Sequence, residues 1–175
     1  MVNADDFGLS TAVNQAVVRA HRQGILTSAS LMMGGAACDE AVEMARQNPR
    51  LGVGLHLTLV CGPSVLPSSE IPGLVDSRGQ FSNDPVRTGF RYFARPSLLP
   101  ELKREIRAQF DKFSRTGLRL DHVNGHLHLH LHPTVLRVLS EHAQGWGIRR
   151  MRLTNDPLVP NLRLASGHWF YRLSH

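Results

Sequence analysis

Residues 122–132 read His122-Val-Asn-Gly-His126-Leu-His128-Leu-His130-Leu-His132 and hold five of the ten histidines in this chain of 175 residues. From His126 onward histidine alternates with leucine, and strict alternation places one residue type on each face of an extended strand. The leucines would then face a core and the imidazoles the opposite side. A buried strand that also carries imidazoles indicates a metal or acid–base site at its end.

The segments outside this stretch alternate between strand-like and helix-like patterns. Ser10 is typical of a helix N-cap, and Leu102, Ile106 and Phe110 fall at helical spacing. This alternating order predicts an α/β fold with a mostly parallel sheet, either open or closed into a (β/α) barrel. The predicted strands are 2–4, 25–33, 51–60, 118–130 and 148–153, and the predicted helices are 11–23, 39–47, 100–116 and 133–145.

Between these elements, residues 61–100 form a long stretch with six prolines and turn signals at 72–73 and 82–85. A connection of this length inside a compact domain predicts a lid or a binding loop. Its aromatic residues either stack on a ligand or form a small core beneath the loop. We expect one domain over 1–175, with an incomplete end after Arg152, because no full β/α unit follows. The aromatic residues are Phe81, Phe90, Tyr92 and Phe93.

The composition excludes several classes of protein. The chain is 42% hydrophobic and 19% charged, with a formal charge of +6, which fits a globular domain. Its arginines are scattered along the sequence, so no nucleic-acid partner is predicted. No apolar run is long enough to span a bilayer, and no signal peptide is visible. Cys38 and Cys61 lack CxxC spacing and favour a reducing cytoplasm, while the basic charge also allows peripheral contact with an inner membrane.

Polar residues interrupt or follow three of the predicted strands: Asp5-Asp6, His56 and the histidine run. Functional residues of parallel α/β folds gather at the carboxyl ends of strands, so we expect one shared site. Adjacent carboxylates point in different directions, which allows one to bind a cation and the other to act as a general base. The alternatives are an acidic region before a helix for the aspartates and a satisfied core residue for His56.

Within the histidine run, neighbours on one strand face would lie about 7 Å apart. One metal ion with bonds of about 2 Å could not bind all of them. We favour His126 as a ligand with His128 next, and we expect His130 and His132 to fix the turn into the following helix. One carboxylate, two histidines and open positions predict a site that activates water rather than a closed structural site.

Three motifs together resemble the YdjC-like carbohydrate deacetylases, which include the chitooligosaccharide deacetylases. They are Asn3-Ala-Asp-Asp-Phe-Gly-Leu-Ser10, Gly54-Leu-His-Leu-Thr58 and the run from His122 to Pro133. The resemblance covers residues 2–155 and is closest to the hopanoid-biosynthesis-associated branch. It differs from many relatives at Asn124, where they have Asp, and the longer family pattern is not recognisable after about residue 158.

The resemblance implies a distorted, incomplete (β/α) barrel that hydrolyses the N-acetyl group of an amino sugar, often as a homodimer. Carried onto this sequence, it makes Asp6, His56 and His126 the ligands of one divalent ion, magnesium or zinc, and Asp5 the general base. No other cofactor is implied. The hopanoid branch further implies a lipid-linked substrate.

The function predicted from the sequence is therefore a cytoplasmic, metal-dependent deacetylase whose substrate enters beneath 61–100. Asp5 would take a proton from the attacking water, and His128 is the first choice to protonate the departing amine or to steady the oxyanion. The alternative is a non-catalytic module that binds metal and carbohydrate. Metal storage is a third possibility, but it does not explain Asp5, Asp6 or His56.

Overall fold

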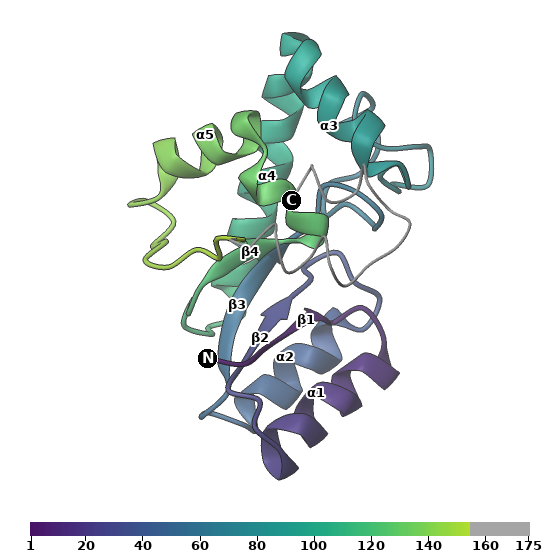
Figure 1. Cartoon of the computed structure of the whole chain (residues 1–175). Coiled ribbons are helices and arrows are strands. Elements are labelled where there is room, and N and C mark those ends of the chain that lie inside the picture. Colours follow the sequence, from purple (N-terminus) through teal and green to yellow (C-terminus); the bar gives the residue numbers. More distant parts are fainter. Residues whose placement is uncertain (155–175) are drawn as a thin grey trace, which may run out of the picture.

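The computed structural model of the chain describes residues 1–154 and contains a four-stranded parallel sheet (Figure 1). Its strands lie side by side in the order β1 (Asn3–Phe7), β2 (Ser28–Leu31), β3 (Gly52–Leu57) and β4 (Val123–Gly125). Because every neighbouring pair is parallel, all four carboxyl ends reach the same edge of the sheet. The predicted α/β fold is confirmed, and over these residues the sheet is open, as in an incomplete barrel.

Four of the helices confirm the helices predicted from the sequence. They are α1 (Thr11–Gln23), α2 (Cys38–Arg46), α4 (Leu99–Arg115) and α5 (Pro133–His142). Ser10 caps α1, since its hydroxyl oxygen accepts a hydrogen bond from the backbone N–H of Val13 at 3.3 Å. Figure 1 shows α1 and α2 together beside β1 and β2, while α4 packs on β3 and reaches α5.

The stretch 61–100 is less irregular than the sequence predicted, because it contains the helix α3 (Pro85–Ala94) and a 3-10 turn, η1 (Pro96–Leu98). The Asp84 carboxylate accepts a hydrogen bond from the backbone N–H of Arg87 at 2.9 Å, and proline occupies the first helical position. The pattern at 82–85 predicts a turn, whereas Asp followed by Pro is also the signature of a helix start.

The aromatic residues of this stretch divide between the core and the surface. Phe81 and Tyr92 are buried, and the Tyr92 hydroxyl donates to the carbonyl of Leu59. Phe90 and Phe93 of α3 are 71% and 68% exposed. No helix within residues 1–154 is both long and apolar enough to cross a membrane.

The prediction of a histidine strand over 118–130 is wrong beyond Gly125. Residues His126–Leu131 form a 3-10 segment, η2, in which Leu127 and His128 have left-handed φ angles of 49° and 58°. The physical reason lies in the neighbouring strand. β3 pairs with β4 only as far as Leu57 and Gly125. Val53 and Leu55 bond toward β4 through their backbone groups, so Leu59 would be the next residue after Leu57 to do so, but its carbonyl oxygen accepts from the Tyr92 hydroxyl at 2.9 Å. The chain after Gly125 therefore has no ladder to join and turns on itself.

The predicted strand over 148–153 is reduced to a single parallel bridge between Met151 and Val123. Val123 donates to the carbonyl of Arg150 at 2.9 Å and accepts from the N–H of Arg152 at 3.0 Å. These bonds hold Arg152 beside β4, close to the carboxyl edge of the sheet. The incomplete end predicted after Arg152 lies almost entirely outside the described residues.

Candidate metal centre

The aspartate pair lies in an irregularity of β1. Ala4 pairs with Ala29 and Phe7 with Leu31, so two residues of β1 face one residue of β2, as in a β-bulge. Asp6 lies in this bulge, and its backbone has a left-handed φ of 61°. The bulge lets Asp5 and Asp6 reach different partners at the same edge of the sheet, as the sequence predicted.

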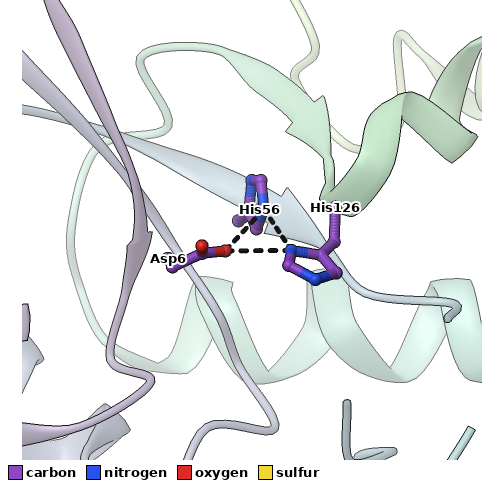
Figure 2. Close-up of side chains that lie close together, drawn as sticks. All are labelled: Asp6, His56 and His126. Atoms are coloured by element: carbon purple, nitrogen blue, oxygen red, sulfur yellow. Dashed lines mark hydrogen bonds and ion pairs between the residues drawn. The ribbon is translucent and has the colours of Figure 1, made fainter. Parts of the chain in front are cut away.

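Asp6, His56 and His126 meet at this edge, each from a different segment (Figure 2). His56 is on β3, and His126 follows β4 directly at the start of η2. Asp6 Oδ1 lies 3.1 Å from His56 Nε2 and 2.9 Å from His126 Nδ1, and the two imidazole nitrogens are 3.2 Å apart. The three predicted ligands are thus brought together, although more than a hundred residues separate Asp6 from His126.

The three side chains differ in their contact with solvent. The His56 side chain is 2% exposed, His126 19% and Asp6 32%. Hydrogen bonds to His126 and His56 hold the pKa of Asp6 far below its usual range, although partial burial opposes the shift. Asp6 is therefore a carboxylate at neutral pH, and the cluster is open to solvent on the side of Asp6.

The donor set suits one divalent cation. Two imidazole nitrogens and one carboxylate oxygen are common zinc ligands, and the ligands of one tetrahedral ion with bonds of about 2.0–2.1 Å stand about 3.3 Å apart. The measured separations of 2.9–3.2 Å require these atoms to move apart by only a few tenths of an ångström. Octahedral ligands at similar bond lengths stand about 3.0 Å apart, so the distances also allow magnesium.

Asp5 is clamped beside this cluster by Arg152. The guanidinium donates to both carboxylate oxygens, at 2.6 and 3.0 Å, and the amide groups of Asn3 and Asn124 donate to Oδ1 at 2.8 and 2.9 Å. Burial by itself would raise the pKa of Asp5, but the bond and charge of Arg152, the charge of His56 and the Asn124 bond outweigh it and lower the pKa. Asp5 is consequently an oriented carboxylate whose Oδ2 has only Arg152 as a partner among the described residues.

The other histidines of the run have separate surroundings. His128 lines a cavity of about 570 Å³ with leucines of η2 and residues of α3. His130 is fully buried, and its Nε2 lies 2.9 Å from the carbonyl of Arg152. His132 caps α5, since its Nδ1 accepts from the N–H of Thr134 at 3.3 Å. His132 thus fixes the turn into α5 as predicted, whereas His130 holds the segment that carries Arg152.

The sequence prediction missed the partners of Asp5. The sequence pattern places Arg152 among scattered arginines, Asn3 in a strand and a family motif, and Asn124 at a departure from the family pattern, without assigning any of them to Asp5. The signal for Asn3 and Asn124 was present: each is a short amide two residues from a predicted site residue, on the same strand face. Arg152 carried no such signal, because its role depends on the pairing of its backbone with Val123.

Backbone strain concentrates around this centre. In the part of the chain that the structure describes, four non-glycine residues have positive φ angles, and three of them are Asp6, Leu127 and His128. Such conformations cost about 1–3 kcal/mol each and persist where the surrounding structure enforces them. The strain therefore marks this edge as a site whose geometry is held in place.

Comparison with known sequences places the chain in a family. A sequence model described as YdjC-like protein matches residues 1–174. The chain belongs to the YdjC-like family. A crystal structure from Enterococcus faecalis V583, provisionally named a cellobiose-phosphate cleavage protein, superposes on this YdjC-like chain with a TM-score of 0.76 at 31% sequence identity, covering 94% of this chain and 62% of that one.

Curated relatives of the YdjC-like chain carry the name carbohydrate deacetylase. The protein of Brevibacillus brevis is 42% identical over 149 residues, covering 85% of this chain and 56% of that protein. The protein of Geobacillus stearothermophilus is 36% identical over 164 residues, covering 93% and 63% respectively. The YdjC-like chain thus spans less than two thirds of the length of these relatives.

Proposed function

We propose that the chain is a metal-dependent carbohydrate deacetylase that hydrolyses the N-acetyl group of an amino sugar. The observation that carries the proposal is the convergence of Asp6, His56 and His126 on one point, with the Asp5 carboxylate oriented beside them. The names of the curated relatives support the reaction class. Metal binding to this triad is part of the proposal.

Zinc suits the triad better than magnesium, because two of its three ligand atoms are imidazole nitrogens and magnesium prefers oxygen. A zinc ion there would supply Lewis acidity to the acetyl carbonyl and to a water molecule. The chain's own contribution is orientation. His56 and His126 present ring nitrogens from two neighbouring strand ends, and Asp6 adds a carboxylate from a backbone position that the bulge holds in place.

Asp5 is the proposed general base. Its Oδ2 accepts the proton of the attacking water, while the Arg152 guanidinium and the two amides keep the carboxylate facing one way. His128 is the proposed proton donor to the departing amine, since it follows His126 in η2 and lines a cavity. When the amide C–N bond breaks, the amine takes this proton and acetate leaves.

The predicted lipid-linked substrate of the hopanoid branch has one supporting feature. The cavity beside His128 is lined mainly by Leu127, Leu129, Leu131 and residues of α3, whose Phe90 and Phe93 are exposed nearby on the same helix. An apolar group attached to the sugar would fit such a lining. The homodimer and the lid role of 61–100 stay predictions.

The test combines metal analysis with acetate release from N-acetylglucosamine oligosaccharides. We expect one ion per chain, which Asp6→Asn removes; asparagine tolerates the left-handed backbone at this position. Asp5→Asn should retain the ion and lower the rate about 10²–10⁴-fold, the usual contribution of a general base. Asp111→Asn, a change to a half-exposed aspartate of α4, is the matched control and should alter neither quantity.

Other outcomes separate the alternatives. One bound ion without acetate release from any acetylated sugar favours the non-catalytic module that binds metal and carbohydrate. Several weakly bound ions per chain, insensitive to Asp6→Asn, favour storage. Acetate release that survives Asp5→Asn at the native rate refutes the role proposed for Asp5.

A further inference from the structure

Asn124 connects the two halves of the site without belonging to the ligand cluster. It is fully buried in β4, opposite His56 in the parallel register between β3 and β4. Its Nδ2 donates to Asp5 Oδ1 at 2.9 Å, and its Oδ1 lies 2.7 Å from His56 Nδ1. One amide therefore contacts both the proposed base and a proposed ligand.

The chemistry of the partners fixes the direction of these bonds. A carboxylate can only accept hydrogen bonds, and Asp5 Oδ1 also receives bonds from Asn3 and Arg152. The Asn124 amide must therefore turn its NH₂ group toward Asp5. Its carbonyl oxygen then faces His56, where it can only accept, so the hydrogen of that bond is on His56 Nδ1.

A second chain of bonds strengthens this assignment from the opposite side of Asp5. The Asn3 amide nitrogen also lies 2.9 Å from Ser30 Oγ, and Ser30 Oγ lies 2.9 Å from His122 Nε2. His122 Nδ1 faces the Asp121 carboxylate at 3.1 Å. Asp121 accepts from Nδ1–H of His122, so Nε2 accepts from the Ser30 hydroxyl and that hydroxyl accepts from Asn3. Asn3 therefore has hydrogens for both Ser30 and Asp5, and Asp5 accepts from both sides.

We infer that Asn124 is a positioning residue: its carbonyl oxygen accepts a hydrogen bond from His56 Nδ1 and so keeps a proton there, which makes Nε2, the nitrogen facing Asp6 and His126, the one that a metal ion would bind. His56 Nε2 is the atom 3.1 Å from Asp6 Oδ1 and 3.2 Å from His126 Nδ1. A hydrogen bond to the second ring nitrogen is the usual way in which proteins set the tautomer of a ligating histidine. This inference rests on the metal centre of the proposed function, but the tautomer can be measured without metal or activity.

Two substitutions separate the acceptor role of Asn124 from its bulk. Asn124→Leu has a similar size but offers no acceptor, so the proton of His56 should move to Nε2, where Asp6 accepts it. Asn124→Asp retains an oxygen facing His56 and should restore the proton on Nδ1. Asn48→Leu is the matched control, because Asn48 is a buried asparagine with two side-chain bonds, to Arg22 and Met44, outside this network.

The first readout is the ¹⁵N spectrum of the His56 ring in metal-free protein at about pH 8.5, roughly two units above the ordinary histidine pKa. We expect a protonated Nδ1 in the native chain, in Asn124→Asp and in Asn48→Leu, and an unprotonated Nδ1 in Asn124→Leu. An unprotonated Nδ1 in the native chain, or a protonated one in Asn124→Leu, overturns the inference. If Asn124→Leu does not fold, the native and Asn124→Asp spectra still decide.

The second readout is zinc affinity, measured by competition with a chromophoric chelator. Loss of a partner behind a ligating histidine typically costs about 10–100-fold in metal affinity, so Asn124→Leu should bind zinc that much more weakly, with Asn124→Asp closer to native and Asn48→Leu unchanged. Native affinity in Asn124→Leu overturns the inference. If the native chain binds no zinc, the proposed function fails, and the ¹⁵N spectra alone judge the role of Asn124.

Discussion

The buried His130 should make the stability of the fold depend on pH. Its side chain is excluded from solvent, and its Nε2 donates to the carbonyl of Arg152. Burial lowers the pKa of His130 from 6.5 to about 4, against the opposing effect of that hydrogen bond. The folded chain therefore keeps the imidazole neutral at pH values where the unfolded chain already binds a proton.

The contribution of neutral His130 to the free energy of unfolding is complete above the pKa of the unfolded chain, about 6.5, and is lost as the pH falls toward 4. Between about pH 7.5 and about pH 4.5, the shift predicts that the free energy of unfolding decreases by about 2.5 kcal/mol through His130 alone. His130→Gln cannot titrate, but its amide can still donate to the carbonyl of Arg152. This variant should lose that part of the pH dependence.

Urea unfolding followed by circular dichroism, in chelator to exclude metal, measures the effect at both pH values. The difference between native chain and variant isolates His130, since the carboxylates titrate in both. His142→Gln replaces an exposed histidine of α5 and should follow the native chain. Equal pH dependence in His130→Gln and the native chain would refute the reasoning.

Three further predictions concern packing and the Asp5 clamp. A Cβ at Gly54 would lie 2.5 Å from His122 Cε1, so Gly54→Ala should lower the free energy of unfolding, measured by chemical denaturation, by about 1–3 kcal/mol. A Cβ at Gly145 would lie 3.7 Å from its nearest atom, so the control Gly145→Ala should change that free energy by about 0.5 kcal/mol or less. By the same measurement, Ile106→Ala in the core should cost about 2–5 kcal/mol, and a loss below about 1 kcal/mol would contradict its burial. Arg152→Lys keeps the charge but not the two hydrogen bonds to Asp5, so the rate of acetate release should fall at least about tenfold while the metal stays bound. Loss of the metal in this variant would show instead that Arg152 is needed for metal binding.

Most of the secondary structure could be predicted because its signals are local. Ser10 caps the start of α1 with its own hydroxyl, and the apolar stripe of α4 consists of the buried residues Leu102, Ile106 and Phe110. The order of strands and helices then implied parallel pairing. α3 was missed because Asp84-Pro85 was assigned to a turn, although the same pair of residues caps a helix. That error was one of interpretation, since the signal was in the sequence.

The failure of the histidine strand has a different cause. The alternation of histidine and leucine leads to a strand only if a neighbouring strand offers backbone groups for hydrogen bonding, and the pairing of β3 with β4 ends at Leu57. The Tyr92 hydroxyl, from a helix thirty-three residues away in sequence, bonds to the carbonyl oxygen of Leu59 instead. No pattern within 122–132 contains that information.

The sequence by itself determined the α/β order and the three segments that would supply ligands, because the carboxyl ends of parallel strands share one edge. Only the tertiary structure decided how those side chains are held: by the bulge at Asp6, by the end of β4 just before His126, and by the amide of Asn124 between Asp5 and His56. Such contacts depend on distances between segments far apart in the chain, and hydrophobic periodicity carries no information about them.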